Sequence, residues 1–270
     1  MSSRSFEIRR FESVPSTQDL LKEMLHRGES VDHLVIRASR QESGRGRFER
    51  AWQSPEGGSY QSLAVADPEG ALRLPQLSLL LALGIAEVLA RKDVEVAVKW
   101  PNDLYLPLPA DLRTVREQRV PAASGGSSSS GIPGKLGGIL CEHARGHLLV
   151  GVGLNVQNRP PPPAGALQGE AVEEVSDWVL AGVGLALDRL RSQEGVTTDS
   201  QGRRLEQFDL LRGKHLRVEL SDRAYEGEYL GVNRNGFLLL RGVTGVREIR
   251  SGRIEIIDAP TDKAKLSGSQ

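Results

Sequence analysis

The chain has 270 residues, of which 39% are hydrophobic, and its 35 basic side chains are balanced by 35 acidic ones. This length suits one large domain, or a large domain with a small one, and the hydrophobic content is sufficient for a packed core. A formal net charge of zero argues against general nucleic-acid binding, which needs an excess of positive charge along one face. A local anion site remains compatible with it.

Cysteine usage and hydropathy predict a soluble protein of the cytoplasm. Cys141 is the only cysteine, so there is no disulfide framework, and a reducing compartment is favoured. Residues 1–10 are charged and lack the apolar core of a signal peptide. No stretch is long and apolar enough to span a membrane: residues 72–90 are interrupted by Pro75 and carry Glu87.

The first hundred residues alternate between strand and helix patterns. A helix begins after the N-cap Ser16 or Thr17 and ends at Gly28, and a second helix is predicted over 77–91 from apolar residues at helical spacing. Short apolar or alternating runs predict strands over 6–11, 34–38, 59–66 and 94–98. Pro101 cannot continue a central strand, so the residues around it should lie at a sheet edge or in a turn.

Composition changes from about residue 107. Residues 107–134 are rich in serine and glycine and behave as a flexible insertion within a domain. Strands over 136–142 and 148–156 then form a hairpin. Gly151 and Gly153 in the second strand imply close approach by another group, because they lack a side chain.

The C-terminal part changes from helix to strand. A helix is predicted over 172–191, and short strands follow at 216–220, 224–232, 236–240, 246–249 and 253–257. A hairpin turn is expected at 233–236. These patterns predict a first domain over 1–205 with the insertion inside it, a small β-barrel over 206–260, and a tail over 261–270.

Residues 44–52, here called the arginine loop, concentrate three arginines and two glycines before Trp52. Glycine lets backbone amides approach a ligand closely, and arginine offers a planar fork of donors that suits phosphate. An indole offers a face for a stacked base. The loop therefore suits a nucleotide-like anion. A solvated basic loop followed by a core tryptophan is the alternative interpretation.

Four further motifs accompany this loop: Ser-Thr-Gln at 16–18, Lys-Trp-Pro-Asn-Asp at 99–103, Lys-Leu-Gly-Gly-Ile-Leu at 135–140 and Gly-Val-Gly-Leu-Asn-Val at 151–156. In this order, with a small β-barrel at the end, the chain resembles biotin protein ligases of the monofunctional type, which lack an N-terminal DNA-binding domain. The resemblance runs from about residue 11 to 257 and is weakest over 107–134 and 160–202.

The resemblance implies an α+β fold in which a mixed sheet with flanking helices, of the class II synthetase type, binds biotin and ATP, and an SH3-like β-barrel follows. It implies that biotin and ATP with Mg²⁺ form biotinyl-5′-AMP, from which biotin passes to a lysine of a biotin carboxyl carrier protein in acetyl-CoA carboxylase or another biotin-dependent carboxylase. Neither DNA nor a membrane is an expected partner; a homodimer is allowed. The five histidines have no metal-ligand spacing, so no protein-bound metal is expected.

The family pattern also assigns site residues. The residues implied for biotin are Ser16, Thr17, Gln41, Gly44, Arg45, Gly46, Lys135 and Gly138. Those implied for the nucleotide are Arg47, Arg50, Trp52, Lys99, Asn102 and Asn155. Lys135 and Arg47 are the implied catalytic cations, and Asp103 is the implied group that orients or deprotonates the acceptor lysine. Simpler roles stay open: helix capping for Ser16 and Thr17, a surface lysine at Lys135, and a turn cap at Asp103.

One departure and two rival functions accompany this interpretation. The family usually carries Arg-Gly where this chain has Phe48-Glu49, so the loop loses a flexible residue and gains a negative charge. A lipoate ligase shares the scaffold, although Trp52 and the terminal barrel favour biotin. A sensor that binds biotin or a nucleotide without turnover is the second alternative.

Overall fold

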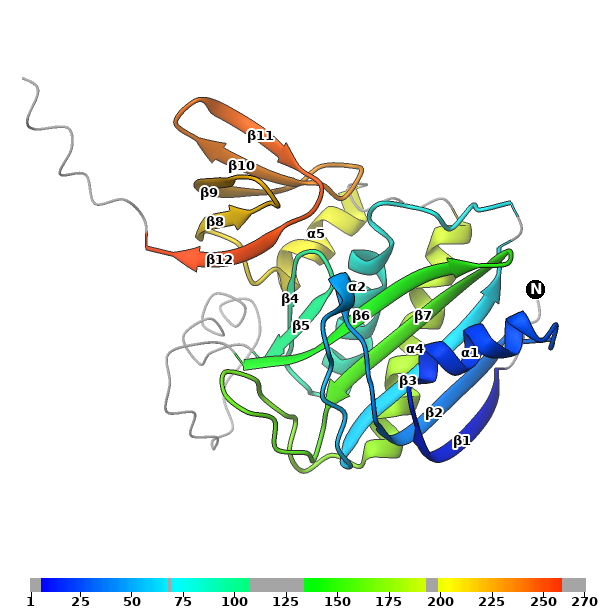
Figure 1. Ribbon diagram of the computed structural model, residues 1–270. Coiled ribbons are helices and arrows are strands. Elements are labelled where there is room, and N and C mark those ends of the chain that lie inside the picture. Colours follow the sequence, from blue (N-terminus) through cyan, green and yellow to red (C-terminus); the bar gives the residue numbers. More distant parts are fainter. Residues whose placement is uncertain (1–5, 68, 107–133, 193–198, 259–270) are drawn as a thin grey trace, which may run out of the picture.

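A seven-stranded mixed sheet and a five-stranded antiparallel sheet form the protein (Figure 1). The structure is a computed structural model, and it describes residues 6–67, 69–106, 134–192 and 199–258. The predicted insertion over 107–134, apart from Gly134, and the tail over 261–270 lie outside the described residues. The strands of the larger sheet are β1 (Glu7–Val14), β2 (Leu34–Gln41), β3 (Gly58–Ala66), β4 (Ala97–Lys99), β5 (Asp103–Leu106), β6 (Gly134–Ala144) and β7 (His147–Asn155).

The larger sheet has the order β1-β2-β3-β7-β6-β5-β4. Only β1 and β2 pair in parallel, and the other neighbours are antiparallel. The predicted strand over 94–98 is wrong in its bounds, because β4 covers only Ala97–Lys99, and β4 is the last strand of the larger sheet. Pro101 follows in the turn to β5, at the edge of the sheet, as expected of a residue without a backbone donor.

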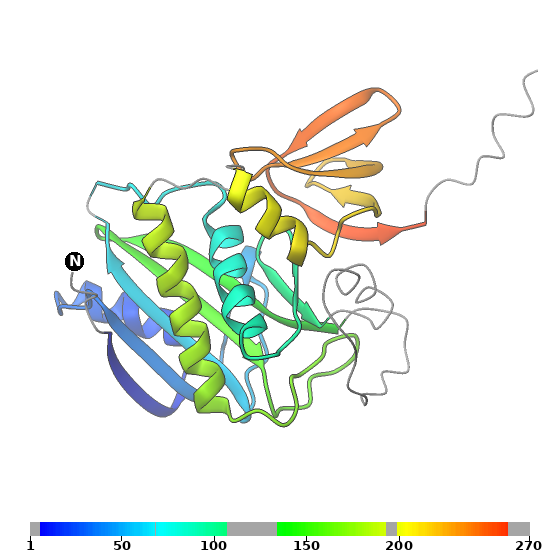
Figure 2. The same ribbon diagram turned by 180° about the vertical axis from the view of Figure 1, so that it is seen from behind.

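Helices cover both faces of this sheet, as Figures 1 and 2 show from opposite sides. α1 (Thr17–His26) packs on one face, where Leu21 and Leu25 bury against Ile36. α2 (Leu77–Ala90) and α4 (Val172–Arg191) cover the other face, with α5 (Asp199–Phe208) beyond them. Successive side chains of β2 therefore pack on opposite faces of the sheet: Ile36 packs against α1, whereas Val35 belongs to the core on the second face.

The helix ends follow local chemistry. Of the two proposed N-caps of α1, Ser16 is the one observed, and its Oγ accepts from the Asp19 backbone N at 3.2 Å. In α4, Gly182 lies against α2: a Cβ there would be 2.5 Å from Ile85 Cα. The small residue thus lets the two helices approach closely. α5 was not predicted, because it is short and polar.

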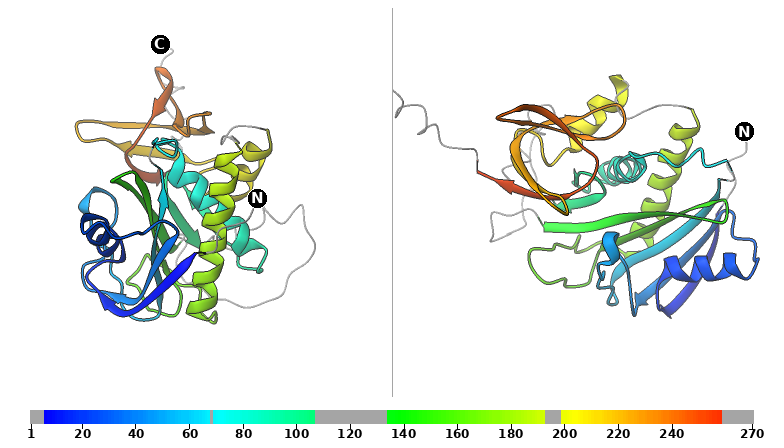
Figure 3. Two further views of the ribbon diagram at one scale, coloured as in Figure 1. Left: turned by 90° about the vertical axis from the view of Figure 1, so that its right-hand side faces the viewer. Right: turned by 45° about the horizontal axis from the view of Figure 1, so that its top comes forward.

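The smaller sheet contains β8 (His215–Glu219), β9 (Ala224–Val232), β10 (Leu238–Gly242), β11 (Gly245–Ile249) and β12 (Arg253–Ile257). Its order is β11-β10-β9-β8-β12, with every pair antiparallel. Figure 3 shows these strands curving beside α5, which is compatible with the expected SH3-like barrel. A domain boundary at 205/206 stays a prediction. None of the described helices is both long and apolar enough to cross a membrane.

Candidate active site

A cavity of about 500 Å³ lies beside the N-terminus of α1. Its walls come from parts of the chain that are distant in sequence: α1, the arginine loop, the β4–β5 turn, the strands β2, β3, β6 and β7, and the start of β12. Its volume falls within the range of sites that enclose small organic ligands. The sheet edge, the loop and the smaller sheet therefore meet around one space.

The arginine loop folds as a short hairpin over this cavity. Arg45 and Ala51 form an antiparallel bridge, and the Gly46 N donates to the Arg50 O at 2.8 Å. Gly44 lies beneath the hairpin, where a Cβ would come within 2.5 Å of the Trp52 O. Gly44 therefore permits the loop to close on itself, and it does not line the cavity.

Lys135 lines the cavity beside Asp103 and Trp52. Its Nζ is 2.8 Å from the Asp103 Oδ1 and 5.5 Å from the centre of the Trp52 ring. The indole packs on β7, since a Cβ at Gly153 would lie 2.6 Å from the Trp52 Nε1, and this buried nitrogen has no hydrogen-bond partner. The close approach predicted at Gly153 is confirmed.

Two further cations face the same space. The Arg47 Nη1 donates to the Asn102 Oδ1 at 3.0 Å, and the Asn102 Nδ2 donates to the Ile139 O at 2.9 Å, which joins the loop to β6. The Lys99 Nζ donates to the Ile254 O at 3.1 Å. Burial lowers the pKa values of both Arg47 and Lys99, and nearby Asp103 acts in the opposite direction.

Neutral polar groups line the end of the cavity near α1. The Gln41 Oε1 accepts from the Thr17 backbone N at 2.9 Å and from its Oγ1 at 3.0 Å. The Thr17 hydroxyl also lies 2.8 Å from the Ser62 Oγ, and the Gln41 Nε2 donates to the Ser54 Oγ at 2.8 Å. These bonds fix the orientation of several donors and acceptors before any ligand arrives.

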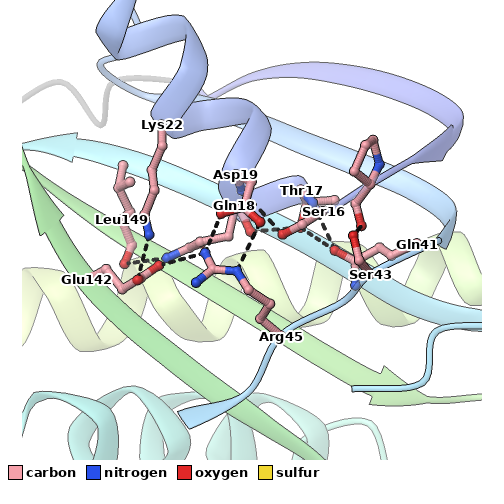
Figure 4. A network of polar contacts seen from close by, with 12 residues as sticks. Ser16, Thr17, Gln18, Asp19, Lys22, Gln41, Ser43, Arg45, Glu142 and Leu149 are labelled. Carbon is pink, nitrogen blue, oxygen red and sulfur yellow. Dashed lines mark hydrogen bonds and ion pairs between the residues drawn. The ribbon is translucent and has the colours of Figure 1, made fainter. Parts of the chain in front are cut away.

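Arg45 projects toward α1 and β6, as Figure 4 shows. Its Nε donates to the Asp19 Oδ2 at 2.9 Å, and its Nη2 contacts both Asp19 and Glu142. Lys22 in turn pairs with Glu142 at 2.6 Å. Although burial alone would raise the pKa of Glu142, hydrogen bonds from Lys22 and Gln18 outweigh burial and lower it. Arg45 and Lys22 thus form ion pairs with two carboxylates, those of Asp19 and Glu142.

The structure brings nearly all the predicted site residues together. The cavity is lined by Ser16, Thr17, Gln41, Arg45, Gly46, Arg47, Arg50, Trp52, Lys99, Asn102, Asp103, Lys135 and Gly138. Gly44 and Asn155 are the exceptions. The buried Asn155 side chain donates to the Gly165 O at 3.1 Å and accepts from the Asn158 Nδ2 at 2.8 Å, so it braces a loop beside the cavity.

Several lining residues were missed as site residues. Gln18 was named only within the Ser-Thr-Gln motif, yet its buried Oε1 has no partner and a Cβ at Gly151 would lie 2.9 Å from it. Tyr105 follows Asp103 by two residues, so strand periodicity was an available signal. Arg253 and Ile254 come from the smaller sheet, and nothing in the sequence indicates that β12 reaches the cavity.

No group of three or more potential metal ligands occurs among the His, Cys, Asp and Glu residues that the structure describes.

Fold and site together define a family. The family model "Biotin/lipoate A/B protein ligase family" matches residues 10–157, more than half of the chain, and the chain belongs to this family. The mixed sheet with its flanking helices matches the catalytic domain of biotin ligases.

Within this family, the chain is similar to several known biotin ligases. The biotin protein ligase from Aquifex aeolicus in complex with biotin and ATP superposes with a TM-score of 0.74 at 26% identity, over 94% of this chain and 99% of that one. The bifunctional ligase/repressor BirA of Bacillus spizizenii is 26% identical over 258 residues, which cover 90% of this chain and 72% of the relative. The biotin--[acetyl-CoA-carboxylase] ligase of Paracoccus denitrificans is 31% identical over 147 residues, about half of each protein.

Proposed function

We propose that this protein is a biotin protein ligase, which activates biotin with ATP and transfers it to a lysine of a biotin carboxyl carrier protein. One observation carries the proposal: Arg47, Trp52 and Lys135, from three separate stretches of chain, line the same cavity. The relatives named above are biotin ligases, and the Aquifex structure holds biotin and ATP.

In the proposed first step, a biotin carboxylate oxygen attacks the α-phosphorus of ATP, and the bond to the bridging oxygen breaks to release pyrophosphate. Negative charge accumulates on the α-phosphate during this step. Lys135 and Arg47 are the cations proposed to stabilise that charge, and Trp52 is proposed to cover the adenine. Mg²⁺ is proposed to enter with ATP as part of the substrate.

In the second step, the neutral amine of the carrier lysine attacks the acyl carbon, AMP leaves, and the amine loses a proton. Asp103 is the proposed acceptor or orienting group for that amine. Because Asp103 pairs with Lys135 at 2.8 Å, the same carboxylate also balances the lysine before an anionic substrate arrives. At the other end, Ser16, Thr17 and Gln41 are proposed to bind the ureido group of biotin.

The partners and compartment follow as parts of the same proposal. The carrier would belong to acetyl-CoA carboxylase, the enzyme in the name of the Paracoccus relative, or to another biotin-dependent carboxylase. A homodimer, the absence of a DNA partner, and the cytoplasm as the compartment stay predictions. The lone Cys141 supports a reducing compartment.

Exchange of labelled pyrophosphate into ATP tests the first step. We expect exchange that requires biotin and Mg²⁺ and that lipoate does not support. Exchange with lipoate alone would identify a lipoate ligase, and biotin binding without exchange would identify a sensor.

Lys135→Ala tests the assignment of the central cation. We expect exchange to fall by about 10²–10³-fold, because one preorganised charge donor at the transition state is lost. Lys92→Ala is the matched control, since the Lys92 Nζ lies 5.7 Å from the Trp178 ring and outside the cavity. Full exchange by a folded Lys135→Ala protein, with an unchanged circular dichroism spectrum, would refute the role of Lys135.

A further inference from the structure

The arginine loop is fastened to the rest of the protein by charged contacts at two points. Arg47 reaches Asn102 on one side of the cavity. On the other side, Arg45 reaches Asp19 in the first turn of α1 and Glu142 in β6. These two partners belong to α1, which packs on the sheet, and to β6, which pairs with β7, so they attach the loop to the body of the fold.

The two carboxylates hold Arg45 with different geometry. Asp19 takes a fork of two guanidinium nitrogens, the arrangement that gives a carboxylate–arginine pair both strength and direction. Glu142 adds a longer contact, 3.4 Å from its Oε2 to the Arg45 Nη2. Its second oxygen, Oε1, lies 2.6 Å from the Lys22 Nζ, so Lys22 holds the Glu142 side chain where Arg45 can reach it.

This network adjoins the ligand space. Gln18 lines the cavity, contacts Glu142, and has a buried carbonyl oxygen without a partner. Asp19 and Glu142 do not line the cavity themselves. They therefore contact the loop from behind, and their influence on a ligand passes through Arg45.

We propose that Asp19 and Glu142 are positioning residues that hold the arginine loop folded over the cavity through the Arg45 guanidinium. This inference rests on the proposed function, because it concerns retention of biotin and its adenylate by that loop. Loss of either carboxylate leaves the Arg47–Asn102 contact intact and releases the opposite side of the loop. Ligand binding then weakens more than turnover does.

The test uses Glu142→Gln and Asp19→Asn, which keep side-chain shape and remove charge. Limited trypsin digestion reports loop order without any ligand, since cleavage after Arg47 and Arg50 requires the loop to open. We expect each variant to be cleaved there about 3–10-fold faster, as befits loss of a half-exposed ion pair. We also expect the Kd for biotin to rise about 3–10-fold, with kcat at saturating biotin changed less than threefold.

Two controls separate a positioning role from general destabilisation. Glu173→Gln removes a carboxylate that pairs with Arg10 and Arg37 on the α4 face, and it should leave loop cleavage and the Kd for biotin unchanged. In an Arg45→Met background, Glu142→Gln should have no further effect on cleavage after Arg47 and Arg50, because its partner is already gone.

Unchanged cleavage and unchanged biotin binding in both variants would overturn the inference. If Asp19→Asn changes loop cleavage and biotin binding but Glu142→Gln changes neither, the positioning role of Glu142 is refuted. If the unmodified protein binds no biotin, the proposed function fails, whereas faster cleavage of the variants would still support the attachment of the loop.

Discussion

Phe48 and Glu49 form the tip of the arginine loop, and both adopt left-handed backbone with φ of 55° and 56°. Side chains rarely adopt this region because Cβ approaches the neighbouring carbonyl oxygen, at a cost of about 1–2 kcal/mol per residue. The tip therefore stores strain that a glycine would avoid. Phe48 is also 66% exposed, with the Arg47 guanidinium 5.0 Å from its ring centre.

Replacing Glu49 with glycine should relieve part of this strain. Since glycine gains about 0.5–1 kcal/mol of entropy in the unfolded chain, we expect a net stabilisation of up to about 1 kcal/mol. Glu56→Gly is the matched control, because Glu56 is exposed and has no positive φ, so that change should destabilise by about 0.5–1 kcal/mol. Urea unfolding measures both, and destabilisation by Glu49→Gly would contradict the strain argument.

At this scale, the sequence indicated residue types better than it indicated their contacts. Arg47, Trp52 and Lys135 stood out because glycines and a motif surround them, and they line one cavity. The pairing of Lys135 with Asp103 was not predicted, although β5 and β6 are adjacent strands. Such a contact depends on strand register, and a single sequence does not fix register across an insertion.

At the scale of elements, the crossing of α2 and α4 depends on two glycines, Gly84 and Gly182, whose packing role was not predicted. A Cβ at Gly84 would lie 2.4 Å from the Gly182 O, and a Cβ at Gly182 would lie 2.5 Å from Ile85 Cα. Both obstacles are backbone atoms, so the helices must move apart to admit a methyl group. The two helices that cross here cover the face of the sheet opposite α1 (Figure 2).

Gly182→Ala should therefore destabilise the protein by about 1–3 kcal/mol, as overpacking of a close contact does. Gly184, two residues further along α4, has open space where its Cβ would be. Gly184→Ala should be neutral or stabilise by up to about 1 kcal/mol, because alanine favours helix. Urea unfolding of the two variants checks the contrast. Equal changes in the free energy of unfolding at both positions would mean that the close contact between α2 and α4 does not cause the destabilisation.

Elements in which apolar residues recur with a clear period were predicted well, whereas elements too short to show a period were not. α4 has the predicted bounds because its apolar face runs for twenty residues. The hairpin turn at Asn233–Gly236 is also confirmed, with the Asn233 N donating to the Phe237 O at 2.9 Å. β5 has only four residues, too few for alternation to be recognised.

At the scale of the whole molecule, Asp209 joins the two sheets. It bridges to Val98 of β4 through the backbone, and its Oδ2 accepts from the Tyr229 hydroxyl of β9 at 2.7 Å. Burial raises the pKa of Asp209 to about 6, although the hydrogen bond from Tyr229 acts in the opposite direction. A carboxyl group that titrates near neutral pH thus lies where the sheets meet.

This shift predicts how stability depends on pH. The folded protein binds the Asp209 proton more tightly than the unfolded chain does. The stabilisation that this proton gives the folded state is therefore full below pH 3.8 and is lost as pH rises through about 6. Asp209→Asn removes the titration. We expect the stability of the unmodified protein, relative to this variant, to fall by up to roughly 3 kcal/mol between pH 4 and 7.

Urea unfolding at several pH values measures that difference, and Asp222→Asn serves as the control. Asp222 is exposed and pairs with Arg223 at the surface, so its variant should show no such fall over the same range. A constant difference between the unmodified protein and Asp209→Asn from pH 4 to 7 would contradict the raised pKa.

The smaller sheet also contacts the Lys-Trp-Pro-Asn-Asp motif directly. The Trp100 Nε1 donates to the Gly236 O at 2.7 Å, and the Lys99 Nζ donates to the Ile254 O. Two consecutive residues of the Lys-Trp-Pro-Asn-Asp motif are thus held by backbone carbonyls far along the chain.

Because β12 forms one wall of the cavity, the cavity is incomplete until the end of the described chain has been synthesised. Ser16 leaves the ribosome early, whereas Arg253 and Ile254 follow more than two hundred residues later. A nascent chain that still holds β12 in the exit tunnel has its arginine loop and both lysines but not the carbonyl that holds Lys99. We therefore expect biotin activation only after β12 has left the exit tunnel and completed the wall of the cavity.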